Sequence, residues 1–301
     1  MKTKTIFISL LVMLLWGFLF PTVKLGYQVF GISSVGDILT FAGLRFFLCG
    51  IVISTYAFFR APKSFVPLRR HIWPVLCVGI FAIILHYTCT YLGLTMTEGS
   101  KTAILKQLGA VFYVCFAPIF FPEDKVTAKK MIGLVLGICG IVAINLTGES
   151  LRFGWGDLLI IGASFCTVFS NVISKKTFRA VEPIVSTGIS QLFGGAVLLT
   201  VGLCAGGDVT ALVPTTPTQG LVFGGILLAS IFSYCLWFST LKKENLSKLF
   251  IIKFAEPLFA SLFGWIILGE DIFNLRYLSA FVLISLGVWV ANQSNGIKEK
   301  S

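Results

Sequence analysis

The chain has 301 residues, of which 56% are hydrophobic and only 12% are charged, and its formal net charge is +11. A water-soluble domain carries about 25% charged residues, so this composition excludes a soluble globular protein. A basic soluble protein would suggest a nucleic-acid partner, but here the Lys and Arg residues fit the loops of a membrane protein better. The sequence therefore predicts that a lipid bilayer surrounds the chain, and it predicts no nucleic-acid partner.

Ten apolar runs follow one another along the chain, each near the length of about 20 residues that crosses a bilayer as a helix. Because lipid offers no hydrogen-bonding partners, such runs must form helices. The first run follows Lys2 and Lys4 as in a signal peptide, but it lacks a small-x-small cleavage site and is interpreted as a retained helix. The predicted spans are 5–20, 38–59, 72–95, 100–121, 129–147, 157–174, 184–205, 219–241, 247–268 and 275–293.

The basic residues of the short loops indicate how the chain is inserted. Most Lys and Arg residues outside the spans fall on the side of the N-terminus, whereas Lys24, Lys101, Arg152 and Arg276 fall on the other side. Basic loops stay in the cytoplasm, so both termini are predicted to be cytoplasmic. Loops this short favour a bacterial inner membrane.

The two halves of the chain, residues 1–147 and 148–301, resemble one another over their last three spans, at a constant shift of 147 residues. The matched positions are Tyr87 with Tyr234, Ser100-Lys101 with Ser247-Lys248, Lys106 with Lys253, Glu123-Asp124 with Glu270-Asp271, Gly140 with Gly287 and Asn145 with Asn292. Since each half has an odd number of spans, the second half enters from the opposite side. The sequence thus predicts an all-α integral membrane protein of two five-helix inverted repeats, which suits alternating access.

Short motifs in a fixed order resemble those of one known family over nearly the whole chain. They are Trp16-Gly17 and Pro21, Arg45-Phe46, Tyr91-Leu92-Gly93-Leu94, Pro122-Glu123-Asp124-Lys125, Gly156-Asp157-Leu158-Leu159, Ala255-Glu256-Pro257-Leu258 and Leu268-Gly269-Glu270. This order is similar to that of EamA-type members of the drug/metabolite transporter superfamily. The resemblance implies ten helices, a central cavity, and export of amino acids or other metabolites; substrate identity does not follow from it.

Ionisable residues at membrane depth are costly and are candidates for function. Lys106 and Lys253 occupy equivalent positions of the two repeats, so both are expected near the membrane midplane, facing an anionic substrate group. Similar basic residues hold phosphate in the triose-phosphate translocators of the superfamily, although Phe254 stands here where those have a second basic residue. The alternative is structural: Glu256 lies one turn from Lys253 and could pair with either lysine.

Three further groups have two interpretations each. Glu256 could couple transport to protons or, with Pro257, bend its helix. Arg45 could contact substrate or brace helices, and His86 could carry protons or be a hydrogen-bonded core residue. The aromatic residues Trp16, Tyr87, Tyr91 and Tyr234 could line a substrate cavity or simply pack.

The small residues and the cysteines allow further predictions about packing, disulfides and metal sites. Gly133 and Gly137 form a G-x-x-x-G pattern, which favours close helix packing and allows a homodimer seam. All eight cysteines lie in apolar runs without C-x-x-C spacing, so neither a disulfide framework nor a metal site is predicted. No cofactor is predicted either.

Three functions compete at this point. A secondary transporter of a small molecule fits the repeats, and the absence of a G-x-x-x-x-G-K-[ST] motif from the sequence argues against direct use of ATP. A membrane-embedded enzyme would need a histidine cluster or a D-x-x-x-D carboxylate pair, neither of which the sequence contains. A lipid or lipid-linked phosphate flippase stays open, since the two lysines could serve a lipid phosphate.

Overall fold

A computed structural model describes residues 3–94, 96, 102, 105–145, 153–269 and 275–293, and these residues form helices without any strand. The first half contains α1 (Thr3–Phe30), α2 (Val35–Arg60), α3 (Leu68–Gly79), the π-helical η2 (Ile80–Leu85), α4 (His86–Leu94), α6 (Leu108–Phe120) and α7 (Ala128–Asn145). The second half contains α8 (Trp155–Thr177), α9 (Pro183–Cys204), α10 (Pro217–Lys243), α11 (Leu246–Ile252), the 3-10 helix η4 (Lys253–Ala255), α12 (Glu256–Leu268) and α13 (Leu275–Asn292).

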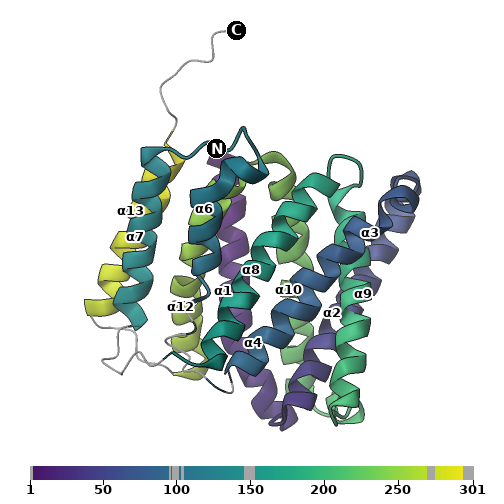
Figure 1. The fold of residues 1–301 in the computed structure, drawn as a ribbon. Coiled ribbons are helices and arrows are strands. Elements are labelled where there is room, and N and C mark those ends of the chain that lie inside the picture. Colours follow the sequence, from purple (N-terminus) through teal and green to yellow (C-terminus); the bar gives the residue numbers. More distant parts are fainter. Residues whose placement is uncertain are drawn as a thin grey trace.

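These helices follow the predicted order of spans (Figure 1). In the described residues, eight helical stretches are long and apolar enough to cross a membrane, and α6 is a shorter apolar helix. The third span runs unbroken from Leu68 to Leu94 through η2, and the ninth runs from Leu246 to Leu268 through η4. The predicted all-α membrane fold is confirmed.

The helix starts are set by local sequence. The hydroxyl of Ser34 accepts the N–H of Asp37 at 3.0 Å and caps α2. Thr216 and Gln219 form a capping box at the start of α10, where Pro217 occupies the first turn. Proline is tolerated there because the first-turn N–H groups have no partner in the helix.

The packing of the helices reflects the internal repeat. Helix α2 packs against its counterpart α9, and α7 packs against its counterpart α13. Helix α1 packs against α10 and α12, while its counterpart α8 packs against the third span and α6. Exchanging the two halves maps this pattern of contacts onto itself, as a two-fold relation between inverted repeats requires.

Glycines allow the closest of these contacts, between α2 and α9. A Cβ atom on Gly43 would lie 2.3 Å from the backbone nitrogen of Leu199, and one on Gly50 would lie 2.2 Å from that of Leu192. Small residues at such crossings are typical of helices packed in lipid, where close backbone approach replaces the hydrophobic effect.

The predicted G-x-x-x-G pattern on α7 is used inside the chain. A Cβ on Gly133 would meet the side chain of Ala291 and the carbonyl oxygen of Gly287, both on α13 at 2.7 Å, and one on Gly137 would meet the ring of Phe254 at the same distance. This face of α7 is therefore already covered by the chain itself.

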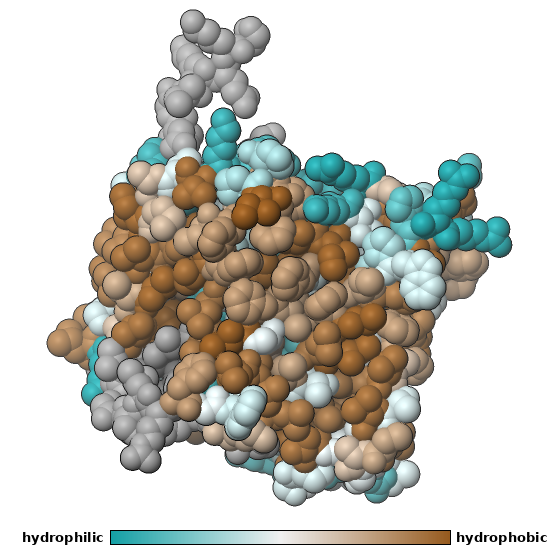
Figure 2. Space-filling model, viewed as in Figure 1, coloured by the Kyte–Doolittle hydropathy of each residue, from teal (hydrophilic) through white to brown (hydrophobic). Residues whose placement is uncertain are grey.

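The distribution of polar and apolar residues on the surface is that of a protein that crosses a membrane. A broad hydrophobic band covers the visible face, and hydrophilic residues gather at the two ends of the helices (Figure 2). Large apolar side chains such as Phe59 and Trp155, both 80% exposed, contribute to the protein surface. Patches of this size on a soluble protein would mark an interface; here they face the lipid.

Candidate functional site

Two repeat-related tyrosines mark the centre of the bundle. The hydroxyl oxygens of Tyr87 on α4 and Tyr234 on α10 lie 3.2 Å apart, and either one can donate. Equivalent residues of two halves related by a two-fold axis touch each other only if the axis passes between them. The pair therefore lies on the pseudo-two-fold axis, where transporters of inverted repeats bind their substrates.

Further aromatic rings join this pair into a continuous row. Phe46 on α2 lies 4.8 Å from Tyr87 and 5.8 Å from Tyr234 between ring centroids. Trp16 on α1 lies 5.8 Å from Tyr234 and 5.0 Å from Trp237. We call Phe46, Tyr87, Tyr234, Trp16 and Trp237 the aromatic row. These separations are favourable for edge-to-face and offset contacts between rings. The aromatic row is therefore a well-packed surface to which four helices contribute.

Two hydrogen bonds and one ring contact fix the ends of the row. The indole N–H of Trp237 donates to the side-chain oxygen of Asn171 at 2.7 Å, and Asn171 donates to the carbonyl of Thr167 at 2.7 Å. Tyr91 lies 5.7 Å from Tyr87, one turn further along α4. The buried Trp237 therefore cannot rotate without leaving the buried amide oxygen of Asn171 unpaired.

Lys253 lies at one end of the aromatic row. Its ammonium nitrogen is 5.1 Å from the ring centroid of Trp16 and 5.8 Å from that of Trp237, which is within cation–π range. Glu256 interacts electrostatically with Lys253 and with Lys106. Among the described residues, however, no carboxylate oxygen lies within 4.0 Å of either ammonium nitrogen.

Lys106 approaches the same region from the fourth span. Its ammonium nitrogen is 5.5 Å from the ring centroid of Phe20 on α1, and it interacts electrostatically with Lys253. The sequence predicted a continuous helix over 100–121, but residues 106 and 107 form a turn and α6 begins only at Leu108. Lys106 therefore lies in an irregular turn of its span, and Lys253 lies at the start of the 3-10 helix η4 of the ninth span.

The interruption at Lys253 has a clear cause. Pro257 has no N–H to donate to the carbonyl of Lys253, and its ring crowds that carbonyl. The N–H of Glu256 bonds to the carbonyl of Lys253 instead, which tightens residues 253–255 into the 3-10 helix η4. On the third span, the π-helical segment η2 ends directly before His86 and Tyr87. Irregular turns of this kind inside helices are frequent at functional sites.

Arg45 lies at the other end of the row and is only 4% exposed. Its guanidinium carbon is 4.3 Å from the centroid of Phe46 and 5.5 Å from that of Tyr87. Its Nε is buried without a hydrogen-bond partner, and no carboxylate of a described residue pairs with it.

His86 is held between α4 and α8. Its Nδ1 lies 3.0 Å from the carbonyl oxygen of Ala163 and 3.1 Å from the hydroxyl of Thr167. A carbonyl oxygen only accepts, so the Nδ1 carries a hydrogen in this arrangement, and the Nε2 is free to accept. The imidazole also lies edge-on to Tyr87, with centroids 5.0 Å apart.

This arrangement agrees with what comparison with known proteins reveals. The sequence pattern of the EamA-like transporter family matches residues 3–146 and again residues 154–293. The chain belongs to the EamA-like transporter family.

Two curated relatives of this EamA-like chain are named as transporters. The uncharacterized transporter YoaV of Bacillus subtilis is 24% identical over 93% of both chains. The uncharacterized inner membrane transporter YedA of Escherichia coli K12 is 24% identical over 92% of this chain and 89% of its own length. A solved structure titled "Crystal structure of protein" has a TM-score of 0.78 at 18% identity, covers 97% of both chains, and shows the same fold.

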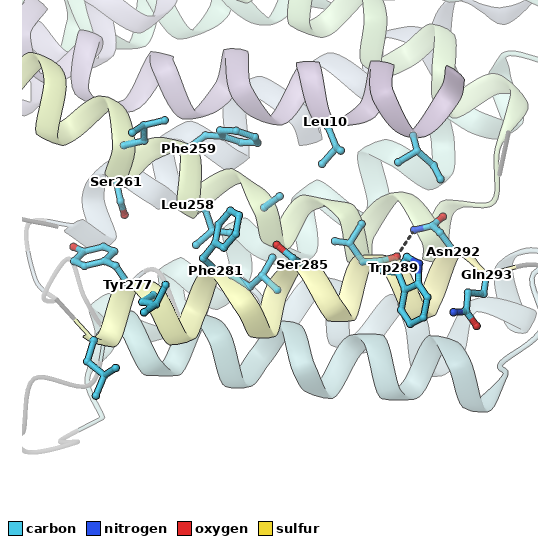
Figure 3. A pocket seen from close by; sticks show the side chains of 17 residues that line it. Leu10, Leu258, Phe259, Ser261, Tyr277, Phe281, Ser285, Trp289, Asn292 and Gln293 are labelled. Carbon is cyan, nitrogen blue, oxygen red and sulfur yellow. Dashed lines mark hydrogen bonds between the residues drawn. The ribbon is translucent and has the colours of Figure 1, made fainter. Parts of the chain in front are cut away.

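The EamA-like chain also has a groove that the sequence did not predict. A volume of about 1090 Å³ lies between α1, α12 and α13 and is lined almost entirely by apolar side chains (Figure 3). Leu10, Phe259 and Phe281 face it from the three helices, and Asn292 lies at one end with its amide donating to the carbonyl of Val288. None of the candidate residues predicted from the sequence lines this groove.

The structure thus brings most of the predicted site residues of the EamA-like chain into one connected group. Trp16, Tyr87, Tyr91, Tyr234 and Lys253 are linked by the ring contacts given above. The sequence missed Phe46 and Trp237, although each stands beside a predicted residue: Phe46 follows Arg45, and Trp237 lies one turn after Tyr234.

Proposed function

We propose that the protein is a secondary transporter that exports or exchanges a small organic anion or an amino acid by alternating access. The observation that carries this proposal is the placement of Lys106 and Lys253. They occupy equivalent positions of the two repeats, lie at irregular turns of their spans, and interact electrostatically with each other, and Lys253 lies beside Trp16 of the aromatic row.

The charges near the axis favour an anionic group. Arg45, Lys106 and Lys253 are cationic in their usual states, and Glu256 is the nearby carboxylate among the described residues. Charges at membrane depth are stabilised by counter-charges. A substrate carboxylate or phosphate would supply part of the missing negative charge, while the aromatic row would pack against its organic part.

The remaining parts of the proposal, which are location, topology and energy source, are based on the sequence. The protein lies in a bacterial inner membrane with both termini cytoplasmic, catalyses no chemical reaction, and draws its energy from a gradient of protons or of a counter-solute. Glu256 is the proposed proton-coupling group because it interacts with both lysines. His86 is the second candidate, since its Nε2 stays available for a proton.

A lipid or lipid-linked phosphate flippase is the second candidate function. The observation in its favour is the apolar groove between α1, α12 and α13, which could hold an acyl chain. Ala255, between Lys253 and Glu256 in sequence, lines that groove.

Thermal unfolding of the detergent-purified protein tests the proposal. The panel contains phosphorylated sugars, dicarboxylates, neutral amino acids and aromatic amino acids, and the variants are Lys106→Ala and Lys253→Ala. The control is Lys242→Ala, which breaks only a surface ion pair with Glu182 at 3.1 Å. A ligand that binds the folded state raises the melting temperature.

We expect an anion to stabilise the wild type and the control but not the two lysine variants. Uptake of the same anion into proteoliposomes should then fall in both variants. Equal stabilisation of all four proteins by neutral amino acids would make the lysines structural. Movement of labelled lipid in proteoliposomes, without uptake of any panel solute, would favour the flippase.

A further inference from the structure

We propose that the substrate is an organic dianion with two separated acidic groups, one bound by Arg45 and the other by Lys253 and Lys106. This inference rests on the proposed transport function and names the substrate class of the same site. It goes further because it assigns a second anion-binding position, at the opposite end of the aromatic row.

The first observation is that Arg45 has donors without acceptors. None of its guanidinium N–H groups makes a hydrogen bond to a described residue, and the Nε is fully buried. The contacts that hold the guanidinium are the faces of Phe46 and Tyr87. A buried cation without a partner is strongly destabilising, and a guanidinium is shaped to bind a carboxylate through two parallel hydrogen bonds.

The second observation is the order of groups between the two cationic ends. From Arg45 the contacts run to Tyr87, then through the hydroxyl pair to Tyr234, then to Trp16, and finally to Lys253. The faces of aromatic rings carry negative potential and do not bind anionic groups, but they bind flat or apolar organic surface well. The part of the substrate between its acidic groups is therefore expected to be apolar and preferably planar.

The third observation is the balance of charge. Arg45, Lys106 and Lys253 are three basic side chains, whereas Glu256 is the one carboxylate that interacts with the two lysines, so two positive charges lack a counter-charge among the described residues of the bundle centre. A dianion would neutralise them, whereas a monoanion would leave one positive charge at membrane depth. A zwitterionic amino acid would bring an ammonium group along with its carboxylate, so both positive charges of the protein would stay uncompensated.

Matched ligands test this proposal on the full-length protein in detergent. The panel pairs benzene-1,4-dicarboxylate with its monomethyl ester and with benzoate, and pairs linear dicarboxylates of four to eight carbons with their monoesters. The variants are Arg45→Gln, Arg45→Lys and Lys253→Gln, with Lys242→Ala as the control. Gel filtration and the ligand-free melting temperature report whether each variant is folded.

We expect some dicarboxylates to bind the wild type roughly ten- to hundredfold more tightly than their monoesters, the range typical of one hydrogen bond to a charged group. Arg45→Gln should abolish that preference by weakening dicarboxylate binding to the level of the monoester, and Arg45→Lys should restore part of it. If Arg45→Gln does not fold, the wild-type comparison of dicarboxylate and monoester still decides the matter.

Equal affinity of dicarboxylates and monoesters for the wild type would overturn the proposal, as would a preference that survives in Arg45→Gln. The failure of the dianion proposal differs from the failure of the transport proposal. In the first case, a monoanion or an amino acid still stabilises the wild type and depends on Lys253. In the second case, no soluble ligand binds at all.

Discussion

The buried carboxylate of Asp124 should contribute more to stability than any surface ion pair of this protein. Asp124 lies in the turn between α6 and α7 and is 2% exposed. One carboxylate oxygen pairs with the ammonium group of Lys130, which is 4% exposed. The other accepts hydrogen bonds from the hydroxyl of Tyr113 at 3.1 Å and from the backbone N–H and hydroxyl of Ser247, both at 3.0 Å.

These contacts join the two repeats at one end of the bundle, because Tyr113 and Lys130 belong to the first half and Ser247 lies in the first turn of α11 of the second. Asp124→Asn keeps the shape of the side chain but removes its charge. The amide has one acceptor oxygen instead of two, so either the ammonium group of Lys130 or the donors of Tyr113 and Ser247 lose their acceptor. Lys130 keeps the carbonyl of Lys125, at 2.6 Å. Removing one partner of a buried ion pair costs about 3–5 kcal/mol.

Reversible unfolding in mixed detergent and denaturing surfactant can measure this loss. We expect Asp124→Asn to lower the free energy of unfolding by about 3–5 kcal/mol, and the exposed-pair control Lys242→Ala to lower it by about 1 kcal/mol or less. Adding Lys130→Met to Asp124→Asn should recover part of the loss, because the unpaired ammonium is gone. A loss below about 1 kcal/mol for Asp124→Asn, or a double variant less stable than the sum of the single ones, would refute this reasoning.

Three further outcomes follow from the structure. Gly50→Ala should lower the free energy of unfolding by about 1–3 kcal/mol or more in the same assay, because the added Cβ would lie 2.2 Å from the backbone of Leu192. The Cβ of Gly224→Ala meets open space, so this control variant should be tolerated. Trp237→Phe should cost about 1–3 kcal/mol and weaken ligand binding in a titration, because the side-chain oxygen of Asn171 loses its donor; an unchanged affinity would separate Trp237 from the site. Uptake should be at least about tenfold faster into vesicles preloaded with substrate than into empty ones, because an empty carrier would have to change state with uncompensated positive charge at its centre; equal rates would contradict this.

The helices could be predicted from the sequence because the membrane leaves so few choices. A run of about 20 apolar residues must become a helix, and the described helices follow the predicted order. The ends of the first helix were placed less well: α1 continues to Phe30, ten residues past the predicted end, across Pro21 and Lys24. Proline and a charged residue suggested an end, but Lys24 is exposed and Pro21 is accommodated inside the helix.

Repeat symmetry is the reason that part of the site could also be predicted. The shift that aligns Tyr87 with Tyr234 and Lys106 with Lys253 is visible in the sequence, and equivalent positions of inverted repeats meet only at the axis. Phe46 and Trp237 could not be found in this way, because their importance comes from contacts between helices far apart in the sequence. Their ring spacing depends on how α1, α2 and α10 pack, which composition does not determine.

The two repeat-related lysines both lie at irregular turns of their helices. The backbone stays hydrogen-bonded at both turns: the carbonyl of Lys253 accepts the N–H of Glu256, and the N–H of Lys106 donates to the carbonyl of Thr102 at 3.0 Å. Pro257 produces the interruption on the ninth span by withholding an N–H from the carbonyl of Lys253. The fourth span has no proline at the matching position, Ala110, and yet residues 106 and 107 form a turn there. The irregular turns at the two lysines therefore fall at equivalent positions of the repeats but differ in form, a 3-10 helix on the ninth span and a turn on the fourth, and a proline accounts for the first alone.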